Sequence, residues 1–471
     1  MDPSKLVEYV NQAVDQGIIP ALSDYVKVPS LSTEFDPEWE TNGLMLEAMN
    51  ILIRYVDSLK INNFTHEVLK EPGKPWLFFG MVEATNSELP TILMYGHFDK
   101  QPHMSGWSEG LGPTNPVIKN DRLYGRGSSD DGYAIPSSAF IIKTLQDFNV
   151  PHGKIVIIGE NEEESDSASL IYYMNKLKDR IGEPKIVVCL DSGVLTYDRF
   201  WVTTSLRGCF NVDVKIKTLK AGLHSGGGSG IVPSTFRILQ MLLARIEDVE
   251  TGRILIKELH TNIEPRHWVE KANMMGAVGR GPFDELPIEE GLQFVSDDIT
   301  QLAINNTYTP TLVVTGMEGL PLLVNAGNVL QPELNVRLSF RLPPGVKADV
   351  ALDAVKRELT RDPPYGAKVS IKCAPADAGW EQKPISPCLD QALDTASQKI
   401  FGKGYLKLGE GGTIPFMGFL GETFPEAQFI ITGVLGGDSN AHSVDECLNI
   451  SYLKKLICCM FETFKALSAS N

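Results

Sequence analysis

The segment Met94-Tyr-Gly-His-Phe-Asp99 closes an apolar run that begins after Pro90, and it ends that run with a His-x-Asp pair. An apolar run of this length between a proline and a polar turn predicts a buried strand. Residues 154–159 and 185–190 form similar apolar runs, and segments of helical periodicity separate the three. This alternation predicts an α/β fold with a mostly parallel sheet that helices cover on both faces.

His97 is the first of several acidic or histidine side chains that follow these runs. Open α/β sheets build their sites beyond the carboxyl ends of the strands, so we expect these side chains at one edge of the sheet. Zinc and manganese both accept imidazole nitrogen and carboxylate oxygen. Asp99, two residues past His97 on the same side of an extended segment, is placed to accept the second imidazole N–H. The candidate metal ligands are His97, Asp130, Glu164, Asp191 and His442.

Each cluster taken alone also has a structural interpretation. A single histidine after a strand is more often structural than metal-bound, and a run such as Glu162-Glu163-Glu164 is more often a solvated face. Asp130-Asp131-Gly132 also suits a helix N-cap followed by a turn. The loop Gly222-Leu-His224-Ser-Gly-Gly-Gly-Ser-Gly230 suits a flexible connector, and it lacks the Gly-Lys-Ser/Thr end of a phosphate-binding loop.

The composition excludes several classes of function. A chain of 471 residues is long enough for two domains. With 43 basic against 59 acidic residues, the net charge of −16 disfavours nucleic acid and anionic membranes as partners. Seven cysteines without a C-x-x-C pair indicate neither a thiolate zinc site nor a disulfide framework. The N-terminal residues do not resemble a secretory leader, and no run of about 18 apolar residues occurs, so we expect a cytoplasmic protein.

A second domain is expected after Leu206-Arg207-Gly208, where apolar and polar residues begin to alternate. Such alternation is typical of a strand with one face in water. The elements predicted next are a helix at 234–248, strands at 311–316 and 334–342, a helix at 349–360 and a strand at 367–373. This β-α-β-β-α-β order predicts a two-layer α+β lid over residues 206–380. Because His442 lies beyond it, the lid must be inserted into a discontinuous larger domain of residues 1–205 and 381–471.

The motifs together resemble those of the M20 family of metallopeptidases and deacylases, over essentially the whole chain. The resemblance is closest to the branch of cytosolic nonspecific dipeptidases and carnosinases. The motifs, in family order, are Gly96-His97-x-Asp99, Tyr124-Gly-Arg-Gly-x-x-Asp130-Asp131-Gly132, Glu163-Glu164-Ser165, Leu206-Arg207-Gly208, Leu223-His224-Ser225-Gly226, Glu410-Gly-Gly-Thr413-Ile-Pro415 and Ala441-His442-Ser443.

The resemblance implies a site with two divalent metal ions per subunit, either zinc or manganese. Two ions about 3.5–4 Å apart can share a water and lower its pKa toward neutrality. The implied assignments are His97 and Asp191 to one ion, Glu164 and His442 to the other, and Asp130 to both.

The same resemblance implies catalytic and substrate-binding residues. Glu163, beside a ligand but not itself one, matches the general base of the family, whose pKa must be raised toward the working pH. His224 matches the histidine that stabilises the oxyanion; in this branch the lid forms a homodimer and lends that histidine to the partner's site. Arg341 resembles an arginine that grips a substrate carboxylate, although a solvent-facing arginine on an alternating strand explains it nearly as well. Asn328 and Thr413 match substrate-contacting positions.

Two segments depart from the family pattern. Many relatives have Asp-Asp-Lys-Gly where this chain has Asp130-Asp131-Gly132-Tyr133, and the dipeptidases have Val-Ile-Pro where it has Asn325-Ala-Gly-Asn328-Val-Leu330. Neither change removes a candidate ligand or the base. Both bear on the choice of substrate more than on the reaction.

The sequence therefore predicts a binuclear-metal exopeptidase that hydrolyses dipeptides or short peptides. A deacylase of N-acyl amino acids would use the same metals, base and oxyanion donor. A catalytically silent ligand-binding protein is disfavoured by Glu163, because metal binding and folding could survive the loss of this residue whereas hydrolysis could not.

Overall fold

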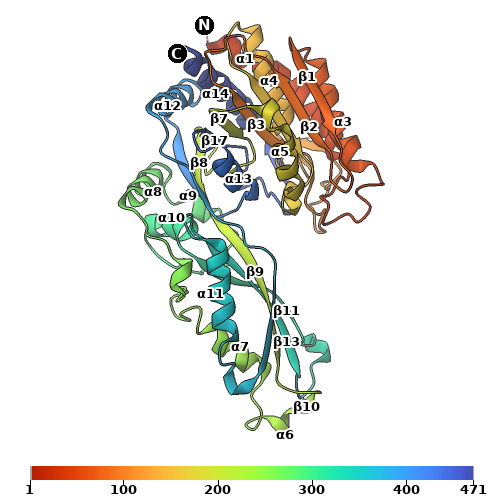
Figure 1. The fold of residues 1–471 in the computed structure, drawn as a ribbon, viewed down its shortest axis with the longest axis vertical. Helices are drawn as coiled ribbons and strands as arrows, with labels where there is room; N and C mark the ends of the chain where they lie inside the picture. The colour runs from red at the N-terminus through yellow and green to blue at the C-terminus, as the bar shows by residue number, and fades with distance from the viewer. Residues whose placement is uncertain (1–2, 470–471) are drawn as a thin grey trace.

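The computed structural model describes residues 3–469 and shows an elongated molecule with a large sheet at one end and a smaller sheet at the other (Figure 1). The strands of the large sheet are β1 (Phe64–Leu69), β2 (Leu77–Val82), β3 (Ile92–His97), β6 (Ile155–Glu160), β7 (Ile186–Cys189), β8 (Trp201–Leu206), β15 (Trp380–Glu381), β16 (Leu406–Glu410) and β17 (Gln428–Ile431). In this part of the chain their order is β1-β2-β6-β3-β7-β17-β8-β15, and β16 pairs with β8. The central strands β6, β3, β7 and β17 are parallel, whereas antiparallel pairs flank them on both sides.

Helices cover both faces of the large sheet because its strands are apolar on both sides. Leu93 and Tyr95 of β3 pack in one core, and Ile92 and Met94 pack in the other. One face is covered by α5 (Ala168–Ile181) and α13 (Pro415–Thr423). The opposite face is covered by α1 (Pro3–Ala13), α2 (Ile19–Val26), α3 (Leu44–Ser58), α4 (Ala134–Asp147), α12 (Pro387–Phe401) and α14 (Ile450–Ala469). None of the helices described between residues 3 and 469 combines the length and apolarity that crossing a membrane requires.

The register of the parallel strands brings their carboxyl ends to one edge. His97 at the end of β3 lies opposite Glu160 at the end of β6, and Tyr95 lies opposite Cys189 at the end of β7. The loops that follow these strands therefore start side by side, as in other open α/β sheets. The sequence predicted these parallel strands, whereas the antiparallel strands at the flanks were not predicted.

The smaller sheet has the order β11-β13-β9-β14 and packs one face on α7 and α11. Its elements are β9 (Gly208–Lys217), α7 (Thr235–Leu243), β11 (Thr311–Glu318), β13 (Glu333–Leu342), α11 (Ala348–Thr360) and β14 (Lys368–Cys373). Leu334, Val336 and Leu338 of β13 face the helices, and the intervening polar residues face the open side. The chain leaves the large sheet after Leu206 and rejoins it at Trp380.

Helices that the sequence pattern did not predict occupy much of residues 265–308. They are α8 (Pro265–Val278), α9 (Gly281–Asp284) and α10 (Ile299–Tyr308). α8 and α10 contact β16, and Met274, Met275 and Ala303 lie in the core beneath the large sheet. This part of residues 206–380 therefore packs on the large sheet rather than on the lid sheet.

Two small sheets complete the described fold. At the far tip of the lid, β10 (Leu223–His224) pairs with β12 (Val329–Leu330) beside α6 (Ser225–Gly228) (Figure 1). The second small sheet has the order β18 (Cys447–Asn449), β5 (Arg122–Tyr124) and β4 (Val117–Lys119). Pairing of β18 with β5 places the loop that contains His442 beside the loop that contains Asp130.

Candidate metal centre

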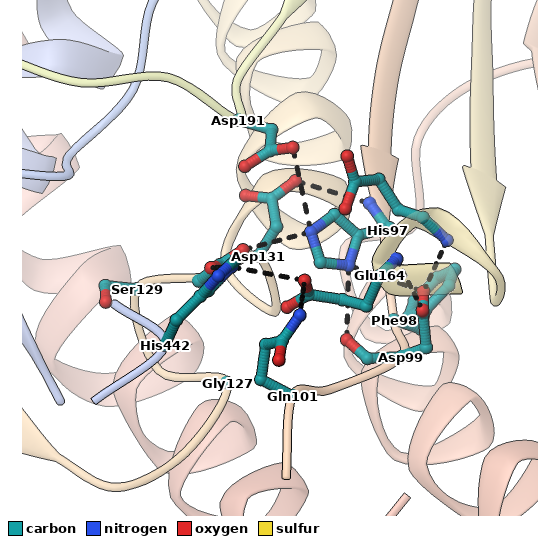
Figure 2. A network of polar contacts seen from close by, with 12 residues as sticks. His97, Phe98, Asp99, Gln101, Gly127, Ser129, Asp131, Glu164, Asp191 and His442 are labelled. Atoms are coloured by element: carbon teal, nitrogen blue, oxygen red, sulfur yellow. Dashed lines mark hydrogen bonds and ion pairs between the residues drawn. The ribbon is translucent and has the colours of Figure 1, made fainter. Parts of the chain in front are cut away.

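The carboxylate of Asp130 lies between two histidines. Its Oδ1 is 3.1 Å from His97 Nε2, and its Oδ2 is 3.0 Å from His442 Nε2. Asp191 Oδ2 lies 3.7 Å from the same nitrogen of His97, and Glu164 Oε2 lies 3.1 Å from the same nitrogen of His442. Figure 2 shows the two histidines, Glu164 and Asp191 turned toward a common centre. One carboxylate is thus shared between two histidine and carboxylate pairs.

The donor set suits two metal ions. Among the described residues, the groups that could hold an ion are His97 with Asp130 and Asp191, and Asp130 with Glu164 and His442; the ligand atoms within each group lie within 4.8 Å of one another. Mixed imidazole and carboxylate donors suit zinc and manganese. Glu164 Oε1 is buried and has no hydrogen-bond partner, as expected of an oxygen that would bind a cation.

Asp99 fixes both the imidazole of His97 and the acidic turn. His97 Nδ1 donates to the backbone carbonyl oxygen of Asp99 at 3.1 Å and lies 3.4 Å from the Asp99 carboxylate. Because a carbonyl oxygen only accepts, Nδ1 carries a proton, which would leave Nε2 as the nitrogen that binds a cation. The Asp99 carboxylate also accepts the N–H groups of Glu163 and Glu164 at 3.2 and 3.0 Å. This second contact was not anticipated from the sequence.

Burial and mutual repulsion shift the pKa values of the carboxyl groups in the site. Burial raises the pKa of Asp191 to about 7, and the charge of Asp130 adds to the rise. Burial, followed by the charge of Asp191, raises the pKa of Glu163 well above its ordinary range. Although burial opposes it, hydrogen bonding to two histidines lowers the pKa of Asp130. Cations held among these groups would offset the repulsion.

Two carboxylates outside the ligand set, the buried Asp131 and the half-buried Glu410, hold segments that carry candidate ligands. Asp131 Oδ2 accepts the N–H of His97 at 3.3 Å. Glu410 accepts the hydroxyl of Ser192 at 2.9 Å and also the N–H of Gly193, both in the turn that begins with Asp191. Both residues lie in sequence motifs, but the motifs did not indicate these contacts.

Sequence reasoning missed Gln101 and Glu446. Gln101 Nε2 donates to Glu164 Oε2 at 2.6 Å (Figure 2). Glu446 is buried against the loop that carries Asp130. Both stand close in the sequence to a candidate site residue, which could have indicated them: Gln101 lies two residues after Asp99, and Glu446 lies four residues after His442.

Packing explains why this chain has Gly132 where many relatives have the lysine of Asp-Asp-Lys-Gly. A Cβ atom at Gly132 would lie 2.4 Å from Cε1 of Tyr25, so α2 leaves no room for a side chain. A buried lysine, Lys100, lies beside the same loop. Its ammonium group donates to the carbonyl oxygens of Tyr25 and Val28 at 2.9 and 2.8 Å. Tyr133 donates to the carbonyl oxygen of Leu190, immediately before Asp191.

A cleft of about 740 Å³ connects the metal centre with the open face of the lid sheet. Glu163, Glu164 and His442 line it on one side, and Arg341 lines it on the other. Arg341 Nη1 donates to Thr413 Oγ1 at 3.0 Å. The cleft is therefore acidic near the candidate metal centre, whereas its lid side carries three basic and two acidic side chains.

His224 and Asn328 lie away from this cleft, at the lid tip. The N–H of Ser225 donates to the carbonyl oxygen of Asn328 at 2.8 Å, and His224 pairs with Val329 across two short strands. The side chain of His224 is exposed, and its Nδ1 accepts the N–H of Gly226 at 3.1 Å. The two residues share one surface, remote from the metal centre of their own chain (Figure 1).

Comparison with known proteins decides the family. The model of Peptidase family M20/M25/M40 matches residues 93–466. The chain belongs to this peptidase family. Its membership confirms the predicted family and the prediction that the chain is an enzyme.

Individual members of the M20/M25/M40 family match most of the chain. The chain is 24% identical over 375 residues to a cysteinylglycine-S-conjugate dipeptidase of Corynebacterium striatum, covering 78% of this chain and 79% of that protein. It is 25% identical over 467 residues to the Cys-Gly metallodipeptidase DUG1 of Candida albicans, covering 92% and 91%. Its fold is similar to that of human carnosine dipeptidase 1, with a TM-score of 0.79, 20% identity and coverage of 100% and 99%. The predicted α/β peptidase fold with a lid is confirmed.

Proposed function

We propose that this M20/M25/M40 peptidase hydrolyses the peptide bond of dipeptides or short peptides with the help of two divalent metal ions. The observation that carries the proposal is the Asp130 carboxylate, whose two oxygens face two separate histidine and carboxylate pairs. The dipeptidases to which the chain is similar over most of its length support this class of substrate.

Glu163 is the general base in this proposal. It lies in the turn whose backbone Asp99 holds, and its raised pKa suits a group that takes a proton from the attacking water and gives it to the leaving amine. When bound, the two ions would lower the pKa of that water and polarise the scissile carbonyl. The residues that would hold zinc or manganese are His97, Asp130 and Asp191 for one ion, and Asp130, Glu164 and His442 for the other.

Arg341 and Thr413 would bind the substrate's free carboxylate. Both line the same cleft as Glu163, and their side chains are already hydrogen-bonded to each other at 3.0 Å. A guanidinium group can bind a carboxylate through two parallel hydrogen bonds, which fixes its orientation as well as its charge. The basic side of the cleft would thus position the peptide so that its carbonyl lies toward the acidic side.

We also propose a homodimer in which the lid tip of one chain completes the site of the other. β11 is an edge strand of the lid sheet, and Val313 and Val314 on it are exposed. The loop that follows exposes Leu323 to 94%. Exposed edge strands and contiguous apolar patches are typical of interaction surfaces. His224 at the tip would then donate to the oxyanion in the partner's cleft.

A cytosolic location remains part of the proposal. The seven cysteines are all free in the structure, which suits a reducing compartment.

A panel of dipeptides, tripeptides and N-acyl amino acids tests the function. We expect metal-loaded protein to release amino acids from dipeptides, as read by mass spectrometry. Glu163→Gln should keep both ions and the fold but lose at least about 100-fold in kcat, because general-base catalysis is lost. Cleavage confined to N-acyl amino acids would contradict the peptide substrate. Absence of any cleavage by protein that carries both ions would contradict the proposed reaction.

A further inference from the structure

Glu446 lies directly behind the loop that carries Asp130, and it is fully buried. Its Oε1 accepts the N–H groups of Gly127, Ser129 and Asp130 at 3.0, 3.2 and 3.3 Å. The same oxygen accepts the hydroxyl of Ser129 at 3.2 Å. Donors from one short loop therefore converge on a single carboxylate oxygen, which fixes the conformation of that loop.

The second oxygen of Glu446 is paired with Arg126, whose side chain is also buried. Arg126 Nη1 donates to Glu446 Oε2 at 2.7 Å. Arg126 Nη2 donates to the carbonyl oxygens of Ser443 and Pro102 at 2.8 and 3.1 Å. Ser443 directly follows a candidate metal ligand, and Pro102 lies in the segment that continues from β3. The buried pair thus joins the three segments that supply His97, Asp130 and His442.

The loop bends tightly around this carboxylate. Gly127 has a φ of +85°, and a Cβ atom there would lie 2.7 Å from Cε of Lys100. A buried ion pair is weak evidence for stability, because desolvation offsets much of the attraction. The fixed loop conformation points instead to a role in the site, where ligands must be held to within about 0.5 Å.

We propose that Glu446 is a positioning residue that orients Asp130 so that its two oxygens face the two ligand pairs. The inference rests on Asp130 being a metal ligand in the proposed function, but it does not depend on the substrate. Removing Glu446 should therefore weaken metal binding in a protein that is still folded. Partners that support metal ligands in this way typically change affinity by about 10–100-fold.

Glu462 provides a matched control. It is a buried glutamate on α14 that pairs with Lys399 at 2.6 Å, and it has no contact with the candidate ligands. Glu462→Gln removes an ion pair of a buried glutamate whose partner is 25% exposed, so it should lower thermal stability without changing metal affinity. This separates a positioning role from a general structural one.

The experiment measures ion binding by the full chain rather than activity. Calorimetric titration with Mn²⁺ and visible absorption spectra with Co²⁺ compare the wild type with Glu446→Ala, Glu446→Gln and Glu462→Gln. We expect Glu446→Ala to bind Mn²⁺ at least about 10-fold more weakly and to show an altered Co²⁺ spectrum. Glu446→Gln keeps an amide oxygen that can accept the loop N–H groups, so it should recover most of the affinity.

Wild-type affinity and spectrum in folded Glu446→Ala would overturn the inference. If that variant does not fold, Glu446→Asp replaces it: the shorter carboxylate keeps the charge but cannot reach the loop, so it should also bind Mn²⁺ at least about 10-fold more weakly. Unchanged binding by Glu446→Asp would then overturn the inference. A wild type that binds no ions would overturn both this inference and the proposed metal site, whereas a wild type that binds two ions but cleaves no peptide would overturn only the proposed function.

Discussion

Asp130 shows that residue type alone does not decide between a helix cap and a metal ligand. An Asp-Asp-Gly segment suits a helix cap and turn as well as a metal site. In the structure, α4 begins at Ala134, and no side-chain hydrogen bond caps its first turn. The carboxylate of Asp130 faces two histidines instead, so its hydrogen bonds lie across the site rather than along the helix.

Removal of divalent ions is expected to destabilise the protein more at pH 8 than at pH 5. Burial raises the pKa of Asp191 to about 7 and also raises that of Glu163, whereas ordinary carboxyl groups titrate near pH 4. A group whose pKa is raised on folding contributes stability below its ordinary pKa, and this stability is lost as the pH rises through the folded value. Bound cations would offset that loss.

Melting temperatures measured with EDTA and with Mn²⁺ between pH 5 and pH 8 check this prediction. The gap between the two curves should widen with pH. A gap that narrows as the pH rises would show that the carboxyl groups do not repel one another in the folded protein.

At this scale the sequence could predict which residues gather as candidate metal ligands, but not how they are held. His97 and Asp130 are recognisable because chemistry restricts the residue types that bind zinc or manganese. Glu446 is not, because any nearby acceptor could hold the loop, and its choice depends on how distant segments meet. The contact between Glu446 and the N–H of Asp130 joins residues 316 positions apart.

At the scale of elements, the helices between residues 265 and 308 show why the hydrophobic pattern did not predict them. α8 buries His267 and Lys271 along with Met274 and Met275, so its buried face is not an apolar stripe. Lys271 Nζ would lie 2.6 Å from a Cβ atom at Gly409, so a larger residue at position 409 would displace the lysine side chain between α8 and β16. By contrast, the central strands were predictable because burial on both faces leaves continuous apolar runs.

Lys271→Met is expected to stabilise the protein at pH 7. Burial lowers the pKa of Lys271 to about 8, below its ordinary value near 10.5. Charging this lysine therefore costs stability at all pH values below about 8, and the cost fades as the pH rises toward 10.5. Replacing Lys271 by methionine should therefore raise the free energy of unfolding by an amount on the order of 1–3 kcal/mol at pH 7 and change it little at pH 10.

Urea denaturation at pH 7 and pH 10 measures this difference, with Lys5→Met, at an exposed position of α1, as the control. Lys271→Met should show a smaller change in unfolding free energy between the two pH values than either the wild type or the control. A variant less stable than the wild type at pH 7, with the pH dependence intact, would mean that the buried ammonium group is stabilising.

At the scale of the whole molecule, the candidate metal centre faces the near end of the lid, whereas the lid tip with β10 and α6 lies at the far end of the lid (Figure 1). His224 and Asn328 are exposed together at that tip, and neither lines the cleft beside Glu163. The side chains described along the cleft include the proposed base, candidate metal ligands and two arginines, but His224 is not among them. A second copy related by a two-fold axis could bring its tip to the cleft, because in such a dimer each contribution is reciprocated.

Mixing two inactive variants should restore hydrolysis if the site is shared between chains. Glu163→Gln removes the base, and His224→Ala removes the oxyanion donor. In a mixed dimer, one site combines Glu163 of one chain with the partner's His224, whereas the other site has neither. Random exchange makes half of the dimers mixed, so the rate of dipeptide cleavage should recover to about one quarter of the wild-type rate. Measured after subunit exchange in dilute denaturant, a mixture no faster than the separate variants would show that His224 does not act across a dimer.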